Sequence, residues 1–330
     1  LDLIRKYSMP APRYTSYPTA PQFHPGFGER ELREVAAASN GDPIPRRLSL
    51  YVHVPFCTSP CFYCGCNRII TRDKARGAAY LARLYREIAL AAELFDRDRE
   101  AIQVHFGGGT PNFLAPAQLH EAVDTLRGHF RFSEAAERDI SIELDPRTLT
   151  DEWAPVLGAI GATRASMGVQ TFSPALQEAI GRLQPIAMIE HGVELLRKAG
   201  VASMNFDLMY GLPGQTRDDV SDALRLAAAF GADRIALFGY AHVPHMIARQ
   251  RRIDASALPG AEQRFRMAEL GHRQLLADGY SPIGFDHFAK PGDPLAGAAV
   301  AGRLHRNFQG FTDDAAPVLL GLGVSAIGSF

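Results

Sequence analysis

Apolar and polar residues alternate strictly over several short stretches of the chain. In residues 48–54 the even-numbered positions are leucine or valine, whereas the odd-numbered ones are Ser49, Tyr51 and His53. Successive side chains of a strand point to opposite faces, so this alternation predicts a strand with one polar face. Further strands are predicted, the last with weaker alternation, at 102–106, 140–144, 166–170, 203–208 and 234–241.

Amphipathic patterns of helical period separate these strands. Helices are predicted at 77–95, 116–127, 151–160, 188–199 and 217–230. Alternating strands and helices imply parallel strands with right-handed crossovers. Parallel strands covered on both faces normally read as continuous apolar runs, and these do not. The pattern therefore predicts an α/β fold, an incomplete (β/α)6 TIM-like barrel whose interior is polar and holds ligands.

Three polar residues stand late in their strands, namely Glu143, Gln170 and Asp207. The carboxyl ends of parallel barrel strands share one rim, where active sites are built. Any one of these residues alone could be an ordinary hydrogen-bonded polar group. Their shared position on one face and one rim favours a functional site.

Composition and charge exclude several classes of protein. The chain has 330 residues, with 35 basic and 36 acidic side chains, so no global basic field favours nucleic acid or an anionic membrane. No run of 18 apolar residues or signal peptide is visible, and no membrane partner is predicted. We expect a cytoplasmic monomer.

All four cysteines lie close together, at Cys57, Cys61, Cys64 and Cys66. A disulfide framework would spread its cysteines along the chain, and this spacing of C-x3-C-x2-C-x-C does not. A short loop carrying several thiolates suits an iron–sulfur cluster. A structural zinc site is the alternative, although such sites more often use two separated pairs.

The spacing of Cys57, Cys61 and Cys64 resembles that of the radical S-adenosylmethionine (SAM) superfamily. The resemblance implies that these three thiolates bind a [4Fe-4S] cluster whose fourth iron binds SAM. Residues 51–67 resemble more specifically the oxygen-independent coproporphyrinogen III oxidases of haem biosynthesis. In that family the fourth cysteine, here Cys66, is not a ligand.

Further segments resemble the same family along nearly the whole chain: 12–20, 141–146, 166–170, 205–213, 240–244, 284–288 and 304–310. We expect residues 1–46 to pack near the active site, residues 47–245 to form the partial barrel, and residues 246–330 to extend the catalytic domain. Family members continue beyond the segment that resembles 321–327 into a C-terminal domain. We expect that domain to be absent here.

Three glycines, Gly107, Gly108 and Gly109, precede Thr110 and Pro111. Alone, the run is consistent with a tight turn, and neither a Rossmann nor a Walker pattern surrounds it. The family resemblance implies that it contacts SAM, and it implies two SAM sites. The SAM on the cluster would be contacted by Tyr51, Gly108, Glu143 and Ile327. The second would be contacted by Tyr63, Gly109, Thr110, Gln170, Arg182, Asp207 and Ala241.

The resemblance further implies oxidative decarboxylation of two propionates of coproporphyrinogen III, giving protoporphyrinogen IX. A 5′-deoxyadenosyl radical from SAM would begin the reaction, so no side chain is assigned as catalytic. The implied partner is an electron donor such as a flavodoxin or ferredoxin. Candidate cations for the substrate carboxylates are Arg13, Arg249, Arg251, Arg252, Lys290, Arg303 and Arg306. Four histidines, His242, His245, His287 and His305, could be core residues or proton donors.

Three other functions stay open at this point. One is a haem-binding carrier related to these oxidases, but such relatives lack the fourth cysteine, so Cys66 and residues 12–20 favour the enzyme. Another is a radical SAM enzyme acting on a different tetrapyrrole. The last is a zinc-binding structural protein.

Overall fold

The computed structural model describes residues 2–7, 18–134, 138–314 and 316–330. Its centre is one sheet in which all six predicted strands occur as parallel neighbours in chain order. They are β1 (Leu48–Val54), β4 (Glu100–Gly108), β6 (Asp139–Leu144), β7 (Arg164–Gln170), β8 (Ser203–Tyr210) and β9 (Arg234–Gly239). Over these residues, no helix is both long and apolar enough to cross a bilayer.

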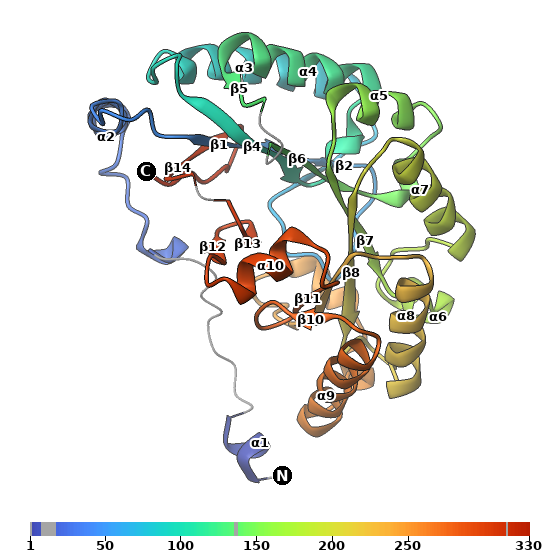
Figure 1. Cartoon of the computed structure of the whole chain (residues 1–330). Helices are drawn as coiled ribbons and strands as arrows, with labels where there is room; N and C mark the ends of the chain where they lie inside the picture. The colour runs from blue at the N-terminus through green and yellow to red at the C-terminus, as the bar shows by residue number, and fades with distance from the viewer. Residues whose placement is uncertain (1, 8–17, 135–137, 315) are drawn as a thin grey trace.

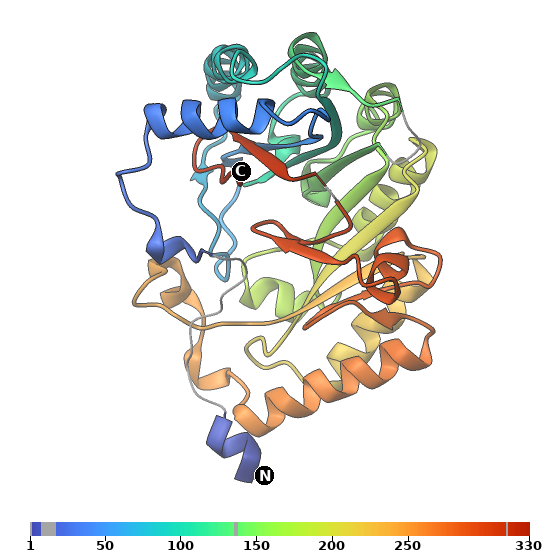
Figure 2. The ribbon, with the colours of Figure 1, turned by 60° about the vertical axis from the view of Figure 1, so that its left-hand side comes forward.

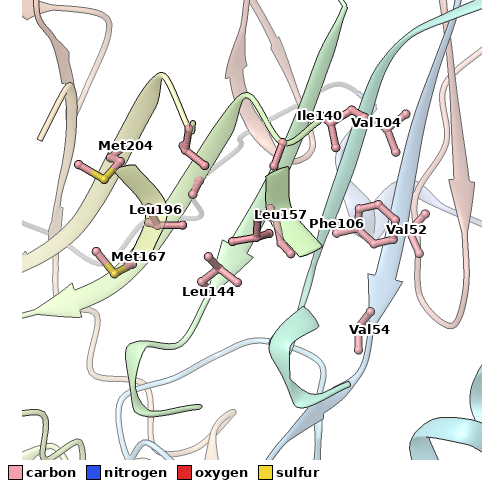
Figure 3. Close-up of a cluster of buried hydrophobic side chains, with 14 of the residues drawn as sticks. Val52, Val54, Val104, Phe106, Ile140, Leu144, Leu157, Met167, Leu196 and Met204 are labelled. Atoms are coloured by element: carbon pink, nitrogen blue, oxygen red, sulfur yellow. The ribbon is translucent and has the colours of Figure 1, made fainter. Parts of the chain in front are cut away.

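Helices cover the outer face of this curved sheet (Figure 1). They are α3 (Ala75–Ala92), α4 (Pro116–His129), α5 (Trp153–Ile160), α6 (Pro174–Ala179), α7 (Ile186–Lys198) and α8 (Arg217–Ala229). The apolar strand positions, such as Val104, Ile140 and Met204, pack there with Leu157 of α5 and Leu196 of α7 (Figure 3). Burial of each of these side chains contributes roughly 2 kcal/mol. It therefore fixes which face of each strand packs against the helices and which faces the barrel interior.

The C-terminal part of the chain adds strands to both ends of the sheet. Strand β14 (Val318–Leu322) runs parallel to β1 and places Gly321 opposite Tyr51. Strand β11 (His287–Ala289) pairs antiparallel with β9 and with β10 (Ser281–Pro282). The strand order is β10-β11-β9-β8-β7-β6-β4-β1-β14, with the short β5 (Arg131–Phe132) beside β4. The alternation pattern did not predict these edge strands.

A hairpin and a helix lie on the concave side of the sheet (Figures 1 and 2). They are β12 (His305–Asn307), β13 (Gly310–Thr312) and α10 (Pro294–Val300). Between them and the sheet is a cavity of about 280 Å³, called the lumen below, lined by Ser141, Glu143, Asn205 and Asp207 among others. The predicted polar interior is therefore confirmed.

The N-terminal region is described in part. Helix α1 (Asp2–Tyr7) lies beside α9 (Ala261–Ala277), as both ribbon views show. After η1 (Ala20–Gln22), α2 (Glu29–Asn40) is held by the buried Arg99, whose Nη1 donates to Ser39 Oγ at 2.6 Å. Arg13 and most of segment 12–20 lie outside the described residues. The division at residues 46 and 245 stays a prediction.

Candidate functional site

The cysteine loop leaves the carboxyl end of β1. Cys57 ends β2 (Phe56–Cys57), which pairs with β3 (Ile69–Ile70), so both ends of the loop are tied together. Cys57 and Cys61 are buried, whereas Cys64 is half-buried and Cys66 is exposed, and all four are free thiols. The three predicted ligands line one pocket of about 330 Å³, called the cysteine pocket below.

Two arginines hold the backbone of this loop. The Arg68 guanidinium donates to the carbonyls of Cys61 at 3.2 Å and Cys66 at 3.4 Å. Arg249, from the turn η4 (Ala248–Arg252), donates through Nε to the Cys64 carbonyl at 2.6 Å. Arg249 was predicted as a partner for substrate carboxylates. The structure shows its bond to the loop, and the substrate contact stays a prediction.

The other predicted substrate cations are scattered. The guanidinium of Arg252 lies 4.1 Å above the ring of Phe62, and that of Arg306 lies 4.3 Å above Phe311. Lys290 and Arg303 line a different cavity of about 1060 Å³, at the amino ends of the strands and therefore opposite the cysteine loop. These positions do not converge on one carboxylate site.

The loop thiols differ in acidity. Hydrogen bonding from Cys66 lowers the pKa of Cys64 to about 6, whereas burial raises the pKa of Cys57 to about 12. Within the described ranges, no three His, Cys, Asp or Glu side chains form a group that could hold a metal ion. The fit to an iron–sulfur cluster therefore rests on the chemistry of the donors. The three predicted ligands and Cys66 all line one pocket, and guanidinium groups lie beside them.

Most of the predicted SAM contacts share this pocket. Its walls include Tyr63, Gly108, Gly109, Thr110, Glu143, Gln170, Arg182 and Asp207. Tyr51 lies in the adjoining lumen, where its ring stacks on His105 with centroids 5.7 Å apart. The lumen and the cysteine pocket share Glu143, Ser166, Asp207 and Phe238 as lining residues, so the two cavities adjoin.

Ala241 and Ile327 line neither cavity. The carbonyls of Ala241 and Tyr63 both accept a hydrogen bond from Gln250 Nε2, each at 3.0 Å. The side chain of Gln250 therefore connects Ala241 to Tyr63, which lines the pocket. The Ile327 backbone packs against Gly321, the residue opposite Tyr51. The SAM contacts of both residues stay predictions.

The glycine run packs against the chain itself. A Cβ on Gly107 would lie 2.9 Å from the Glu143 carboxylate, and Gly108 has a φ of 117°. Gly108 also donates its N–H to Glu143 Oε2 at 3.1 Å. Gly107 and Gly108 therefore approach the neighbouring strand closely and fix Glu143 in the wall of the pocket, whereas the SAM contact of the run stays a prediction.

Gly109→Ala is expected to destabilise the protein by about 1–3 kcal/mol, because a Cβ there would lie 2.6 Å from the Phe56 carbonyl oxygen, which cannot rotate away. Gly128→Ala is the matched control. Gly128 lies in α4, and a Cβ there would meet no neighbouring atom of the described residues within 4 Å, so alanine should stabilise the helix by about 0.5–1 kcal/mol. Urea unfolding of both variants checks the opposite signs.

Two hydrogen-bonded groups line the lumen and include carboxylates that also line the cysteine pocket. His105 lies 2.6 Å from Ser141 Oγ and 3.1 Å from Glu143 Oε1. On the neighbouring strands, Asp207 accepts from Asn205 Nδ2 at 2.8 Å and from Ser166 Oγ at 3.3 Å. Both carboxylates keep oxygen lone pairs toward the cavity and can accept hydroxyl groups there.

Gln170 has a strained backbone beside these carboxylates. Its φ is 67°, in the left-handed region, and β7 bulges between Gly168 and Gln170. Such conformations in residues other than glycine cost about 1–3 kcal/mol and cluster at functional sites. The strain supports the prediction that this strand end is part of a binding site.

The stability of the protein should depend on pH through Asp207. Burial, and then the charge of Glu143, raise the pKa of Asp207 to about 6. The unfolded carboxyl ionises near pH 4, so the folded state loses stability as pH rises from about 4 to about 6. Relative to Asp207→Asn, wild type should lose about 2–3 kcal/mol across this window, as measured by urea unfolding of the metal-free protein. A constant difference between the two proteins would contradict the assignment.

Several site residues were not found by sequence reasoning. Arg147, two residues after Asp145, donates through Nη2 to Cys61 Sγ at 3.4 Å. Gln309 lines the lumen, and its buried amide nitrogen and oxygen have no hydrogen-bond partner in the described part of the chain. Arg147 could have been indicated by its position just after a strand end. Gln309 lies in segment 304–310, which resembles the family, but nothing in its local pattern indicates that it faces the lumen.

Known proteins resemble this chain over most of its length. The family model described as "Radical SAM superfamily" matches residues 51–227. The oxygen-independent coproporphyrinogen III oxidase of Pseudomonas aeruginosa is 45% identical over 326 residues, which are 99% of this chain and 70% of that protein. The enzyme of the same name from Escherichia coli is 43% identical over 327 residues, again 99% of this chain and 70% of that protein.

The fold agrees with these sequence matches. The solved structure of coproporphyrinogen III oxidase from Escherichia coli, described as a radical SAM enzyme, matches with a TM-score of 0.91 at 41% identity. The match covers 99% of this chain and 73% of that one. The chain therefore belongs to the oxygen-independent coproporphyrinogen III oxidase family of the radical SAM superfamily.

Proposed function

We propose that this chain catalyses the oxidative decarboxylation of two propionates of coproporphyrinogen III to vinyl groups, giving protoporphyrinogen IX. One observation carries the proposal. Cys57, Cys61 and Cys64 line the same pocket as most of the predicted SAM contacts, and that pocket adjoins the polar lumen. The curated relatives that cover nearly the whole chain have the corresponding name.

Membership of the radical SAM superfamily brings a [4Fe-4S] cluster and SAM. Cys57, Cys61 and Cys64 would hold the cluster, and their free thiols fit it as donors. When bound, the cluster supplies the electron that cleaves SAM into the radical which takes hydrogen from a propionate. Cys66 lines the same pocket, and its backbone N–H donates to Cys64 Sγ at 3.4 Å.

The finer proposal is that two SAM molecules bind. Glu143 and Asp207 would accept the ribose hydroxyls, because each presents carboxylate oxygens to the cavity. Tyr51, on the lumen side of Glu143, belongs to the site on the cluster, and Gln170 and Thr110 belong to the second. Equilibrium dialysis tests this stoichiometry: two SAM per chain are expected, and one per chain would contradict the second site.

The chain would also position the substrate and exclude water. The residues that line the lumen include Phe311 and Gln309, on the hairpin on the concave side of the sheet. A propionate carboxylate entering from the rim could accept a hydrogen bond from the Gln309 amide, which has no partner in the described residues. Holding the reacting carbon still beside the radical source is the main contribution open to the protein.

An electron carrier can reach the site from the loop side. Gly65 and Cys66 are exposed, and Arg251 and Arg252 are exposed close by on the turn that covers the loop. A flavodoxin or ferredoxin could therefore approach the cluster there, with cations favouring an acidic partner. We propose in addition that the chain acts as a monomer.

The proposed reaction is tested by anaerobic turnover of the reconstituted protein with SAM, a strong reductant and coproporphyrinogen III. Products with vinyl groups are expected in liquid chromatography, together with 5′-deoxyadenosine. A porphyrinogen that carries ethyl groups in place of propionates is the matched control and should not be converted. SAM cleavage without change of coproporphyrinogen III would contradict the proposed substrate.

A further inference from the structure

Two guanidinium groups converge on the sulfur of Cys61. Arg147 Nη2 and Arg182 Nη1 lie 3.4 Å and 3.3 Å from Cys61 Sγ, and both donate a hydrogen bond to it. Cys61 is buried, so little water competes for this sulfur. Among the described residues, guanidinium hydrogen bonds to a cysteine sulfur are recorded at Cys61 and not at Cys57, Cys64 or Cys66.

A buried carboxylate holds the two arginines in place. Asp145 accepts from Arg147 Nε at 2.9 Å and from Nη2 at 2.6 Å, and from Arg182 Nη1 at 3.4 Å. Burial alone would raise the pKa of Asp145, but Arg182 and Arg147 hold it at about 2, so the carboxylate stays charged. Asp145 is itself fixed through Asn112, whose Oδ1 accepts from the Asp145 N–H at 3.0 Å.

We propose that Arg147 is a positioning residue that raises the reduction potential of the cluster through its hydrogen bond to Cys61. This inference rests on the proposed function for the cluster. Reduction adds one electron to the cluster and neither forms nor breaks a bond. Hydrogen bonds to ligand sulfurs and nearby positive charge stabilise the more negative, reduced state.

Arg147 can be changed with less damage than Arg182. Arg182 also donates to the Gly168 carbonyl at 2.6 Å and to Gln184 Oε1 at 3.1 Å, and so it holds the end of β7. Apart from the Cys61 sulfur, the hydrogen bonds recorded for the Arg147 side chain in the described residues go to Asp145. Arg147→Gln therefore removes one charge and one sulfur contact while Arg182 still pairs with Asp145.

The test is a redox titration of the reconstituted cluster without SAM or substrate, followed by electron paramagnetic resonance of the reduced state. At the potential where wild type is half reduced, Arg147→Gln should show about a tenfold lower ratio of reduced to oxidised cluster. That ratio corresponds to a midpoint about 59 mV lower for a one-electron couple. Arg252→Gln is the matched control, because Arg252 lies at the same loop over Phe62, and it should titrate like wild type.

A titration in which Arg147→Gln carries full iron and follows wild type would overturn the proposal. So would an equal shift in Arg252→Gln, because the effect would then not depend on the sulfur contact. If Arg147→Gln takes up no iron, Arg147→Lys decides: a midpoint below wild type supports the proposal, and an unchanged midpoint rejects it. A wild-type protein that binds no cluster would instead contradict the proposed function itself.

Discussion

Replacement of Cys57, Cys61 or Cys64 by alanine is expected to abolish binding of the iron–sulfur cluster, whereas Cys66→Ala should retain it. All three thiols line the pocket, and each would supply one of the three thiolates that hold the cluster. Cys66 is exposed, and its thiol is hydrogen-bonded to Cys64, which raises the pKa of Cys66. Iron and sulfide analysis after anaerobic reconstitution checks the four variants.

Cys66→Ala is the matched control because it removes a thiol from the same loop without removing a predicted ligand. Loss of iron in this variant as well would show that the ligand assignment is wrong. A colourless protein that binds zinc in place of iron would favour a structural zinc site and contradict the cluster.

Asp145→Asn is expected to lower the free energy of unfolding by about 3–5 kcal/mol. The substitution keeps the shape of the side chain but leaves the buried guanidinium group of Arg182 and the partly buried one of Arg147 without the anion between them. Removing one partner of a buried ion pair leaves an uncompensated charge, which is far more costly than loss of an exposed pair. Urea unfolding of the metal-free protein measures the change.

Asp222→Asn provides the comparison for this prediction. Asp222 pairs with Arg225 at 2.9 Å, and both side chains are about two-thirds exposed, 64% and 67%. The expected loss there is below about 1 kcal/mol, because water already screens the pair. Equal losses in the two variants would refute a special role for the buried carboxylate.

Local patterns in the sequence were sufficient to predict the inner strands and the polar lumen. Alternation in residues 203–208 reports which side chains face the cavity, because Ser203, Asn205 and Asp207 line the lumen while the other face packs in the apolar core. The pairing of β14 with β1 could not be predicted in this way. Leu48 pairs with Val318 across nearly the whole chain, and a five-residue apolar stretch does not indicate its partner.

In the candidate site, too, local features could be predicted from the sequence, whereas contacts between distant segments could not. The cysteine spacing and the glycine run are local and were found. Gly108 and Gly109 line the cysteine pocket, and the run also packs closely against Glu143 and the β1–β2 junction. The roles of Arg147 and Arg249 depend on contacts between distant segments. Arg249 reads as a surface charge in the sequence, but the turn at η4 brings it onto the Cys64 carbonyl.

The most direct test of the proposed function follows deuterium from substrate to cofactor. Coproporphyrinogen III labelled with deuterium at the propionate β-carbons is incubated anaerobically with the reconstituted protein, SAM and a reductant, and 5′-deoxyadenosine is analysed by mass spectrometry. We expect deuterium in the 5′-deoxyadenosine, with vinyl groups formed in the porphyrinogen. Unlabelled 5′-deoxyadenosine beside unchanged coproporphyrinogen III would contradict the proposal that this chain abstracts hydrogen from these propionates.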